Sequence, residues 1–127
     1  MRAVDTNVLV RLIARDDPKQ VAVAEAYVAG GAWVPYLAVA EAAWVLESVY
    51  ERDSAAIATA IEMLLNHEHL SVQDAEVVEA AVRQFRRQPK TGFSDCLMLE
   101  VARKAGHTPL GTFDRALGKV VGAQTLR

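Results

Sequence analysis

Residues 3–12, which decide the fold, have the sequence AVDTNVLVRL. Asp5 follows the short apolar run Ala3-Val4 and precedes a segment with helical periodicity, so we expect it to end a strand and to open a helix. Such a position lies at the carboxyl edge of a sheet, where ligands bind in open α/β folds. The stretch therefore predicts an α/β fold with Asp5 at its functional crevice.

Short apolar strands alternate with helices along the rest of the chain. Strands are predicted at residues 2–4, 32–34, 70–72, 108–112 and 123–126. Helices are predicted at residues 7–14, 17–29, 38–50, 53–66, from 74 onward, 94–105 and 115–119, with Asp17, Asp53 and Asp74 as N-caps. This alternation predicts one domain, residues 1–127, in which helices flank a mostly parallel sheet of about five strands in three α/β/α layers. The helix at residues 94–105 is apolar almost all round, so we expect it to be central and well buried.

The composition is that of an ordinary globular protein. Hydrophobic residues make up 52% of the chain and charged residues 24%, which excludes disorder. No apolar run approaches the roughly 18 residues of a transmembrane helix, and no secretory signal is visible. Cys96 is the single cysteine, which fits a reducing cytoplasm. The net charge of −2 argues against tight, nonspecific binding to duplex nucleic acid.

Three further acids occupy positions comparable to that of Asp5. Glu41 is expected in the first turn of the helix after the second strand, Asp95 in the first turn of the helix at residues 94–105, and Asp114 after the fourth strand. These positions share one edge of a parallel sheet. Four carboxylates at one edge repel one another unless a divalent cation lies between them. The pattern predicts a Mg²⁺ or Mn²⁺ site suited to phosphodiester cleavage, although each acid alone is also compatible with a helix cap.

Four segments, in order along the chain, resemble the PIN-domain ribonucleases and, within them, the VapC-type toxins of bacterial toxin–antitoxin pairs. The segments are MRAVDTNVLV at residues 1–10, VAEAAWVL at 39–46, FSDCLM at 93–98 and TFD at 112–114. Together they span nearly the whole chain, which makes the ordered set far more specific than Asp-Thr-Asn alone. Two positions depart from the family pattern, because Ala40 replaces a common serine or threonine and Gly92 offers no additional acid.

The resemblance implies a Mg²⁺- or Mn²⁺-dependent endoribonuclease that cleaves single-stranded or loop RNA. It implies that members are usually homodimers and that a cognate antitoxin protein inhibits them. The positions that match the family's metal ligands are Asp5, Glu41, Asp95 and, often through water, Asp114, and those that match polar residues orienting the ligands are Asn7 and Thr112. Neither departure from the pattern removes a ligand.

Two regions outside the acids are candidate contact surfaces. Arg11 lies on the helix after Asp5, from which it could meet an RNA phosphate, although simple solvation explains it equally well. The helices at residues 38–50 and 53–66 carry more apolar surface than one side of a sheet absorbs. This surplus, which includes Trp44, Val45 and Met63, predicts a homodimer or an antitoxin interface.

Other functions fit parts of the pattern. A receiver-like or phosphatase-like Mg²⁺-dependent domain has the same architecture, but Asp5-Thr6-Asn7 lacks the second aspartate of an Asp-x-Asp pair and the last strand offers no lysine. A PIN-like module with weak catalysis that acts mainly by binding a partner is the second alternative, and the complete set of acids disfavours it. His67 and His69 are more consistent with surface histidines than with a zinc site.

Overall fold

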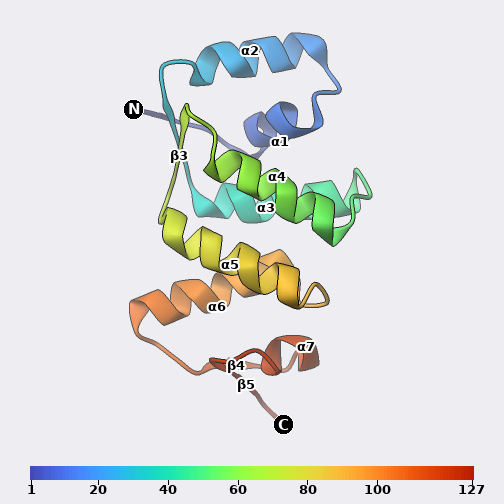
Figure 1. Ribbon diagram of the computed structural model, residues 1–127, viewed down its shortest axis with the longest axis vertical. Helices are drawn as coiled ribbons and strands as arrows, with labels where there is room; N and C mark the ends of the chain where they lie inside the picture. The colour runs from blue at the N-terminus through green and yellow to red at the C-terminus, as the bar shows by residue number, and fades with distance from the viewer. The chain divides into compact units, whose positions relative to one another are not determined.

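The elements follow one another in the predicted alternation of strands and helices. A computed structural model describes all residues, Met1–Arg127, and contains seven helices and five strands. The chain forms two compact units, Met1–Ala75 and Glu76–Arg127, which we call unit 1 and unit 2. In Figure 1 the colours from blue to green mark unit 1 and those from yellow to red mark unit 2.

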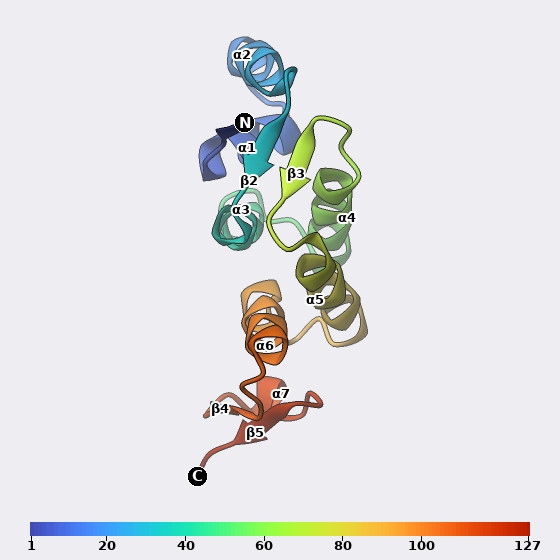
Figure 2. The same ribbon diagram turned by 90° about the vertical axis from the view of Figure 1, so that its left-hand side faces the viewer.

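Unit 1 contains a parallel three-stranded sheet. Its elements are β1 (Arg2–Ala3), α1 (Thr6–Ala14), α2 (Pro18–Val28), β2 (Ala32–Val34), α3 (Tyr36–Ser48), α4 (Ser54–Leu65) and β3 (Leu70–Val72). The strand order is β1-β2-β3, with Ala3 opposite Trp33 and Trp33 opposite Ser71. Figure 2 shows β2 and β3 side by side, with α4 next to β3. Parallel strands place their carboxyl ends, and the residues that follow them, at one edge.

Two backbone hydrogen bonds extend the ladder at that edge. The Val4 N–H donates to the Trp33 carbonyl at 3.1 Å, and the Gln73 N–H donates to the Val34 carbonyl at 2.8 Å. Val4 is buried, so the chain leaves the sheet directly before Asp5. The sheet therefore fixes the backbone on which Asp5 and Gln73 stand.

Helix α1 occupies the centre of the packing in unit 1. It packs against α2 and α3, while α4 packs against α3 and β3. Leu9 and Val10 of α1 and Val39 and Leu46 of α3 are fully buried. Burying such a side chain is worth about 1.5–3 kcal/mol relative to leaving it exposed. This apolar contact holds the first turn of α1 in a defined position against α3.

Unit 2 contains the remaining elements and a parallel two-stranded sheet. The elements are α5 (Ala75–Arg87), which begins at the unit boundary, α6 (Phe93–Ala105), β4 (Leu110–Thr112), α7 (Arg115–Gly118) and β5 (Ala123–Thr125). Gly111 of β4 lies opposite Gln124 of β5, and α7 packs against both strands (Figure 1). Phe85 of α5 meets Phe93 of α6 edge to face, with ring centroids 6.1 Å apart. A small core consists of Leu99, Leu117 and Val120 with the partly buried Leu110 and Ala123.

The predicted α/β class and the parallel pairing of the strands are confirmed. The strands are hydrogen-bonded as two sheets, one in each unit, where the sequence suggested a single sheet. The predicted N-caps Asp17 and Asp53 accept hydrogen bonds from the Gln20 and Ala56 N–H groups. None of the seven helices has the length and apolar character that a membrane span requires.

The prediction that the helix at residues 94–105 is well buried holds for one of its faces only. Helix α6 buries Phe93, Cys96, Leu97 and Leu99, but Met98 is 55% exposed. The physical reason is helical geometry, because successive residues turn by about 100° and a run of four apolar residues cannot lie on one face. Arg103 and Lys104 in the last turn of the helix are also exposed.

Candidate functional site

Asp5 lies at the end of β1 and is the N-cap of α1. Its Oδ1 accepts a hydrogen bond of 3.1 Å from the Val8 backbone N–H, while its second carboxylate oxygen has no hydrogen-bond partner. The side chain is exposed. The carboxylate lies next to the N-terminal end of α1, which carries the positive end of the helix dipole. Asp5 thus combines one oxygen fixed by the helix with one oxygen open to a ligand.

Glu41 is held by a residue next to Asp5. The Thr6 hydroxyl donates a hydrogen bond of 2.7 Å to Glu41 Oε2, across 35 positions of the sequence. Thr6 is the first residue of α1, and Glu41 lies on α3, so the bond joins the two helices at the end where Asp5 stands. The position of the Glu41 carboxylate is set by this hydrogen bond and by the apolar packing between α1 and α3. Unit 1 therefore presents Asp5 and Glu41 as a linked pair.

The expectation that Glu41 occupies the first turn of its helix is wrong. Helix α3 begins at Tyr36, two residues earlier than predicted, which moves Glu41 into the second turn. Pro35 is the N-cap with a φ of −63° and offers no capping side chain. The missing cap is provided by Gln73, whose Oε1 accepts a hydrogen bond of 3.1 Å from the Tyr36 N–H. Because this cap comes from 37 residues away, the local sequence does not reveal where the helix starts.

Unit 2 contains the other two predicted acids as a second pair. Asp95 lies in the first turn of α6 and is half-buried. Burial raises the pKa of its carboxyl group above the ordinary value, and the negative charge of Asp114 raises it further. No hydrogen-bond donor contacts the Asp95 carboxylate in the structure. Asp95 is therefore a carboxylate whose ionisation is opposed by its surroundings, and a cation would relieve this opposition.

Asp114 is anchored from two directions. Its Oδ1 accepts from the Leu117 N–H at 2.9 Å, which makes it the N-cap of α7. Its own backbone N–H donates to Thr112 Oγ1 at 2.9 Å. Thr112 thus contacts the backbone of the acid that it was expected to orient. The side chain of Asn7, the other expected supporting residue, is exposed and makes no hydrogen bond to either acid of unit 1.

The four acids thus occur as two pairs, Asp5 with Glu41 in unit 1 and Asp95 with Asp114 in unit 2. Within either unit, no three His, Cys, Asp or Glu side chains gather closely enough to hold a metal ion. Each pair supplies carboxylate oxygens, the ligands that Mg²⁺ and Mn²⁺ prefer. A pair alone gives only part of the predicted ligand set.

Asp5 is one of the residues that line a groove in unit 1. The groove has a volume of about 640 Å³ and lies between α1 and α2, with Asn7 and Arg11 on one wall and Lys19 and Tyr27 on the other. Arg11 Nη1 forms an ion pair of 2.8 Å with Asp16 Oδ1. The size is typical of ligand-binding clefts. The groove therefore places basic side chains on the same surface as one of the predicted metal ligands.

Other reactive side chains are unsuited to catalysis. Cys96 is fully buried, and burial, with the nearby charges of Asp95 and Glu100, raises the pKa of its thiol to about 12. The thiol is therefore neutral at physiological pH and cannot act as a nucleophile. His69 Nε2 lies 3.0 Å from Glu68 Oε1, and no third ligand joins the two neighbouring histidines in a metal site.

The sequence patterns missed two residues that position the acids of unit 1. Thr6 stood inside the Asp-Thr-Asn segment, but its hydroxyl had no predicted role. Gln73 directly follows β3, so the rule that singled out Asp5, a polar residue at the carboxyl end of a strand, applies to it equally. The partners of both residues, Glu41 and Tyr36, are more than 30 positions away, and only the fold reveals them.

Comparison with protein families gives a match over nearly the whole chain. The sequence model of the PIN domain matches residues 2–123, which include all four acids and parts of both units. A comparison with curated proteins found no match. PIN domains are generally nucleases and typically use divalent metal ions. The chain belongs to the PIN domain family.

Proposed function

We propose that the protein is a Mg²⁺- or Mn²⁺-dependent endoribonuclease, with Asp5, Glu41, Asp95 and Asp114 as its metal-binding acids. Residues 1–127 then act as one PIN domain to which each unit contributes one pair. The observation that carries the proposal is the hydrogen bond from Thr6 to Glu41, because it ties the second acid to the residue beside the first. A carboxylate that served only as a helix cap would not require a hydrogen bond to the residue next to another acid.

The residues present fit a hard divalent cation. All four side chains are carboxylates, and those of Asp5, Glu41 and Asp114 are exposed, which suits an ion that keeps several water ligands. The raised pKa of Asp95 reflects partly the charge of Asp114, which a bound cation neutralises. Asp5 and Asp114 each also accept a hydrogen bond from a backbone N–H in the first turn of a helix, which orients their carboxylates within each unit.

The side chains have distinct roles in this proposal. When bound, the metal supplies an activated water and stabilises the oxygen that leaves the phosphorus. The Val8 N–H orients one oxygen of Asp5, and Thr6 orients Glu41, so both acids are in place before the ion binds. Thr112 holds the backbone of Asp114. Asn7, exposed beside Asp5 in the groove, is proposed to orient the acids through water.

We further propose that the RNA is single-stranded or looped, and that the protein is the toxin of a toxin–antitoxin pair in the cytoplasm. The resemblance of the four acidic segments to the VapC-type toxins supports both. Exposed apolar side chains on α3 and α4, among them Trp44 at 64% and Met63 at 62%, support a homodimer that also binds an antitoxin. Light scattering should give the mass of a dimer at tens of micromolar; a stable monomer that binds no antitoxin contradicts this part.

Cleavage of a labelled RNA panel tests the enzymatic part. The wild-type chain should cleave single-stranded RNA in Mn²⁺ or Mg²⁺ and not in chelator, and Asp5→Asn should be inactive. Asp53→Asn is the matched control, because Asp53 caps α4 through the same kind of bond, 2.8 Å to the Ala56 N–H, and lies outside the acids. Robust cleavage by folded Asp5→Asn, or equal losses in both variants, would contradict the assignment.

A further inference from the structure

Unit 2 contains a hollow beside Asp114 that none of the proposed metal-binding acids lines. Its volume is about 570 Å³, and no Asp or Glu side chain contributes to its walls. Three of its six lining residues are basic and two are apolar, and the full set is Phe113, Arg115, Lys119, Thr125, Leu126 and Arg127. A concave surface with several cations and no acid attracts an anionic ligand.

Two of these cations, Arg115 and Lys119, have no acidic partner in the protein. Both side chains are exposed and form no ion pair or hydrogen bond, and Asp114, their neighbour in the sequence, pairs with neither. They are four residues apart, at the first residue and the C-cap of α7, which places them one helical turn apart on the same face. Like charges at this spacing repel each other, so a bound anion would stabilise both.

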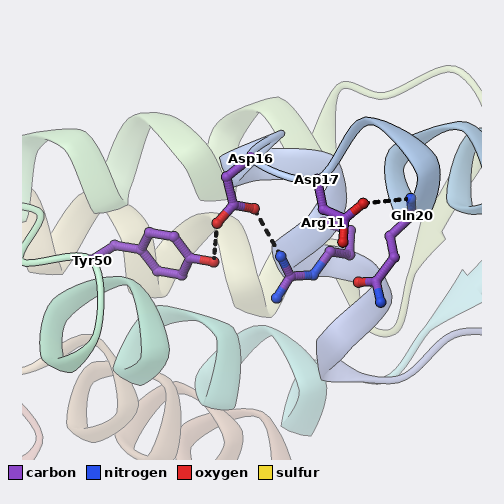
Figure 3. A network of polar contacts seen from close by, with 5 residues as sticks. All are labelled: Arg11, Asp16, Asp17, Gln20 and Tyr50. Carbon is purple, nitrogen blue, oxygen red and sulfur yellow. Dashed lines mark hydrogen bonds and ion pairs between the residues drawn. The ribbon is translucent and has the colours of Figure 1, made fainter.

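An arginine of unit 1 shows how the protein compensates a cation elsewhere. Figure 3 shows Asp16 between Tyr50 and Arg11, with its two carboxylate oxygens bound to the one and to the other. The Arg11 Nη1 lies 2.8 Å from Asp16 Oδ1, and the Tyr50 hydroxyl donates to Asp16 Oδ2 at 3.0 Å. The charge of Arg11 is therefore paired within the protein, whereas the charges of Arg115 and Lys119 are available to a ligand.

Phe113 adds an exposed aromatic ring to the hollow. The side chain is 77% exposed and directly precedes Asp114. In unit 1 Arg2 covers the ring of Tyr27 at 4.8 Å, but no ring or cation of the protein stacks on Phe113. A single exposed ring is common on protein surfaces. Next to unpaired cations it matches a nucleotide, whose base stacks on an aromatic ring while its phosphate meets a basic side chain.

We propose that this hollow binds the RNA substrate beside the cleaved bond, with Phe113 stacked on a base and Arg115 and Lys119 in contact with phosphates. The inference rests on the proposed function, since it concerns the same substrate. Asp114 does not line the hollow, so the nucleotide held there is not the one whose phosphate reacts. Stacking on Phe113 requires an unpaired base, which makes the contact specific for single-stranded or looped RNA.

The affinity for RNA and its salt dependence test the proposal without catalysis. Fluorescence anisotropy of a labelled single-stranded RNA is measured in chelator, over a range of salt, for the full chain. Each phosphate contact on a single strand adds about 0.7 to the slope of log affinity against log salt, so Lys119→Gln and Arg115→Gln should each lower the slope by this amount. Phe113→Leu stays apolar but loses the ring, so binding should weaken about tenfold at an unchanged slope, and Phe113→Tyr should bind like wild type.

Lys104→Gln is the matched control for charge. Lys104 also lies in unit 2, but it pairs with Glu76 at 2.6 Å and does not line the hollow, so its loss should leave the slope unaltered. A duplex RNA of the same sequence is the control for stacking, because its bases are already paired and Phe113→Leu should not weaken its binding. Thermal melts verify that each variant folds, and Arg115→Gln carries the charge test if Lys119→Gln is unfolded.

Several results would overturn the proposal. Wild-type slopes in both Lys119→Gln and Arg115→Gln, with wild-type affinity in Phe113→Leu, would leave the hollow to a protein partner. An equal loss of slope in Lys104→Gln would reduce the effect to overall charge. Full binding by Phe113→Leu alone would refute the stacked base. Cleavage by wild type with unchanged binding in the variants refutes this inference alone, whereas no cleavage in any metal refutes the proposed function.

Discussion

The two pairs of acids differ in whether neighbouring groups of the protein compensate the negative charge of each carboxylate. In unit 1, hydrogen-bond donors contact both carboxylates, the Val8 N–H on Asp5 and the Thr6 hydroxyl on Glu41. In unit 2, Asp95 has no donor, and both burial and Asp114 raise its pKa. Both carboxylates of the first pair accept a hydrogen bond from the protein, whereas the second pair contains Asp95, whose charge no neighbouring donor or cation compensates. In the proposed metal site, unit 1 would supply two carboxylates that hydrogen bonds already orient, and unit 2 a carboxylate whose ionisation a bound cation would favour.

The largest effect on cleavage is expected from removing the hydrogen bond that positions Glu41 in unit 1. Thr6→Val keeps the size of the side chain and removes the donor to Glu41, which should lower metal-dependent cleavage about 10- to 100-fold, the usual range for residues that orient metal ligands. Thr6→Ser restores a hydroxyl and should recover most activity. A purely structural role predicts instead that activity follows the melting temperature across the three proteins, so both quantities are measured together.

The next effect concerns the charge of Asp95 in unit 2, and here the substitution is expected to preserve or raise stability. Asp95→Asn removes an unfavourable charge, so its stability in chelator should equal or exceed that of wild type. The folded pKa of Asp95 lies above its unfolded value, so its contribution to stability falls as pH rises from the unfolded pKa through the folded one. The variant should lose this part of the pH dependence.

Asp53→Ala serves as the comparison, because loss of an ordinary N-cap destabilises by about 1 kcal/mol. Mn²⁺ should stabilise wild type by about 2.7 kcal/mol at a hundredfold excess over its dissociation constant, and Asp95→Asn much less. Thermal melts in chelator and in Mn²⁺ measure both. If Asp95→Asn melts lower in chelator and responds to metal like wild type, Asp95 is a structural residue.

A smaller effect is expected at Thr112, which contacts the backbone of Asp114 and not its carboxylate. Thr112→Val removes one neutral hydrogen bond, worth about 0.5–1.5 kcal/mol, so cleavage should fall only several-fold. A loss as large as that of Thr6→Val would show that the two units position their acids in the same way. Cleavage rates of the two variants under identical conditions make this comparison.

The sequence predicted what depends on local pattern. Helix caps such as Asp17 and Asp53, the strand at residues 32–34 and the position of Asp5 at the end of β1 follow from neighbouring residues, and the structure confirms them. What it could not predict depends on distant partners. Gln73 caps α3 at Tyr36, so the helix starts earlier than predicted, and Thr6 donates a hydrogen bond to Glu41. Neither contact can be seen in the periodicity of the local sequence. Helical geometry predicts that a run of four apolar residues cannot all be buried, and Met98 is exposed. The apolar composition of the segment had instead favoured burial.

Metal binding by variants from both units tests the central claim most directly. Titration calorimetry with Mn²⁺ compares wild type, Asp5→Asn of unit 1 and Asp95→Asn of unit 2, with Asp53→Asn as the control. If all four acids serve one site, each site variant should bind Mn²⁺ at least tenfold more weakly, and the double variant should lose less than the sum of the two. Asp53→Asn should bind like wild type. Unchanged Mn²⁺ affinity in either single variant, with folding intact, would contradict a site shared by the two units.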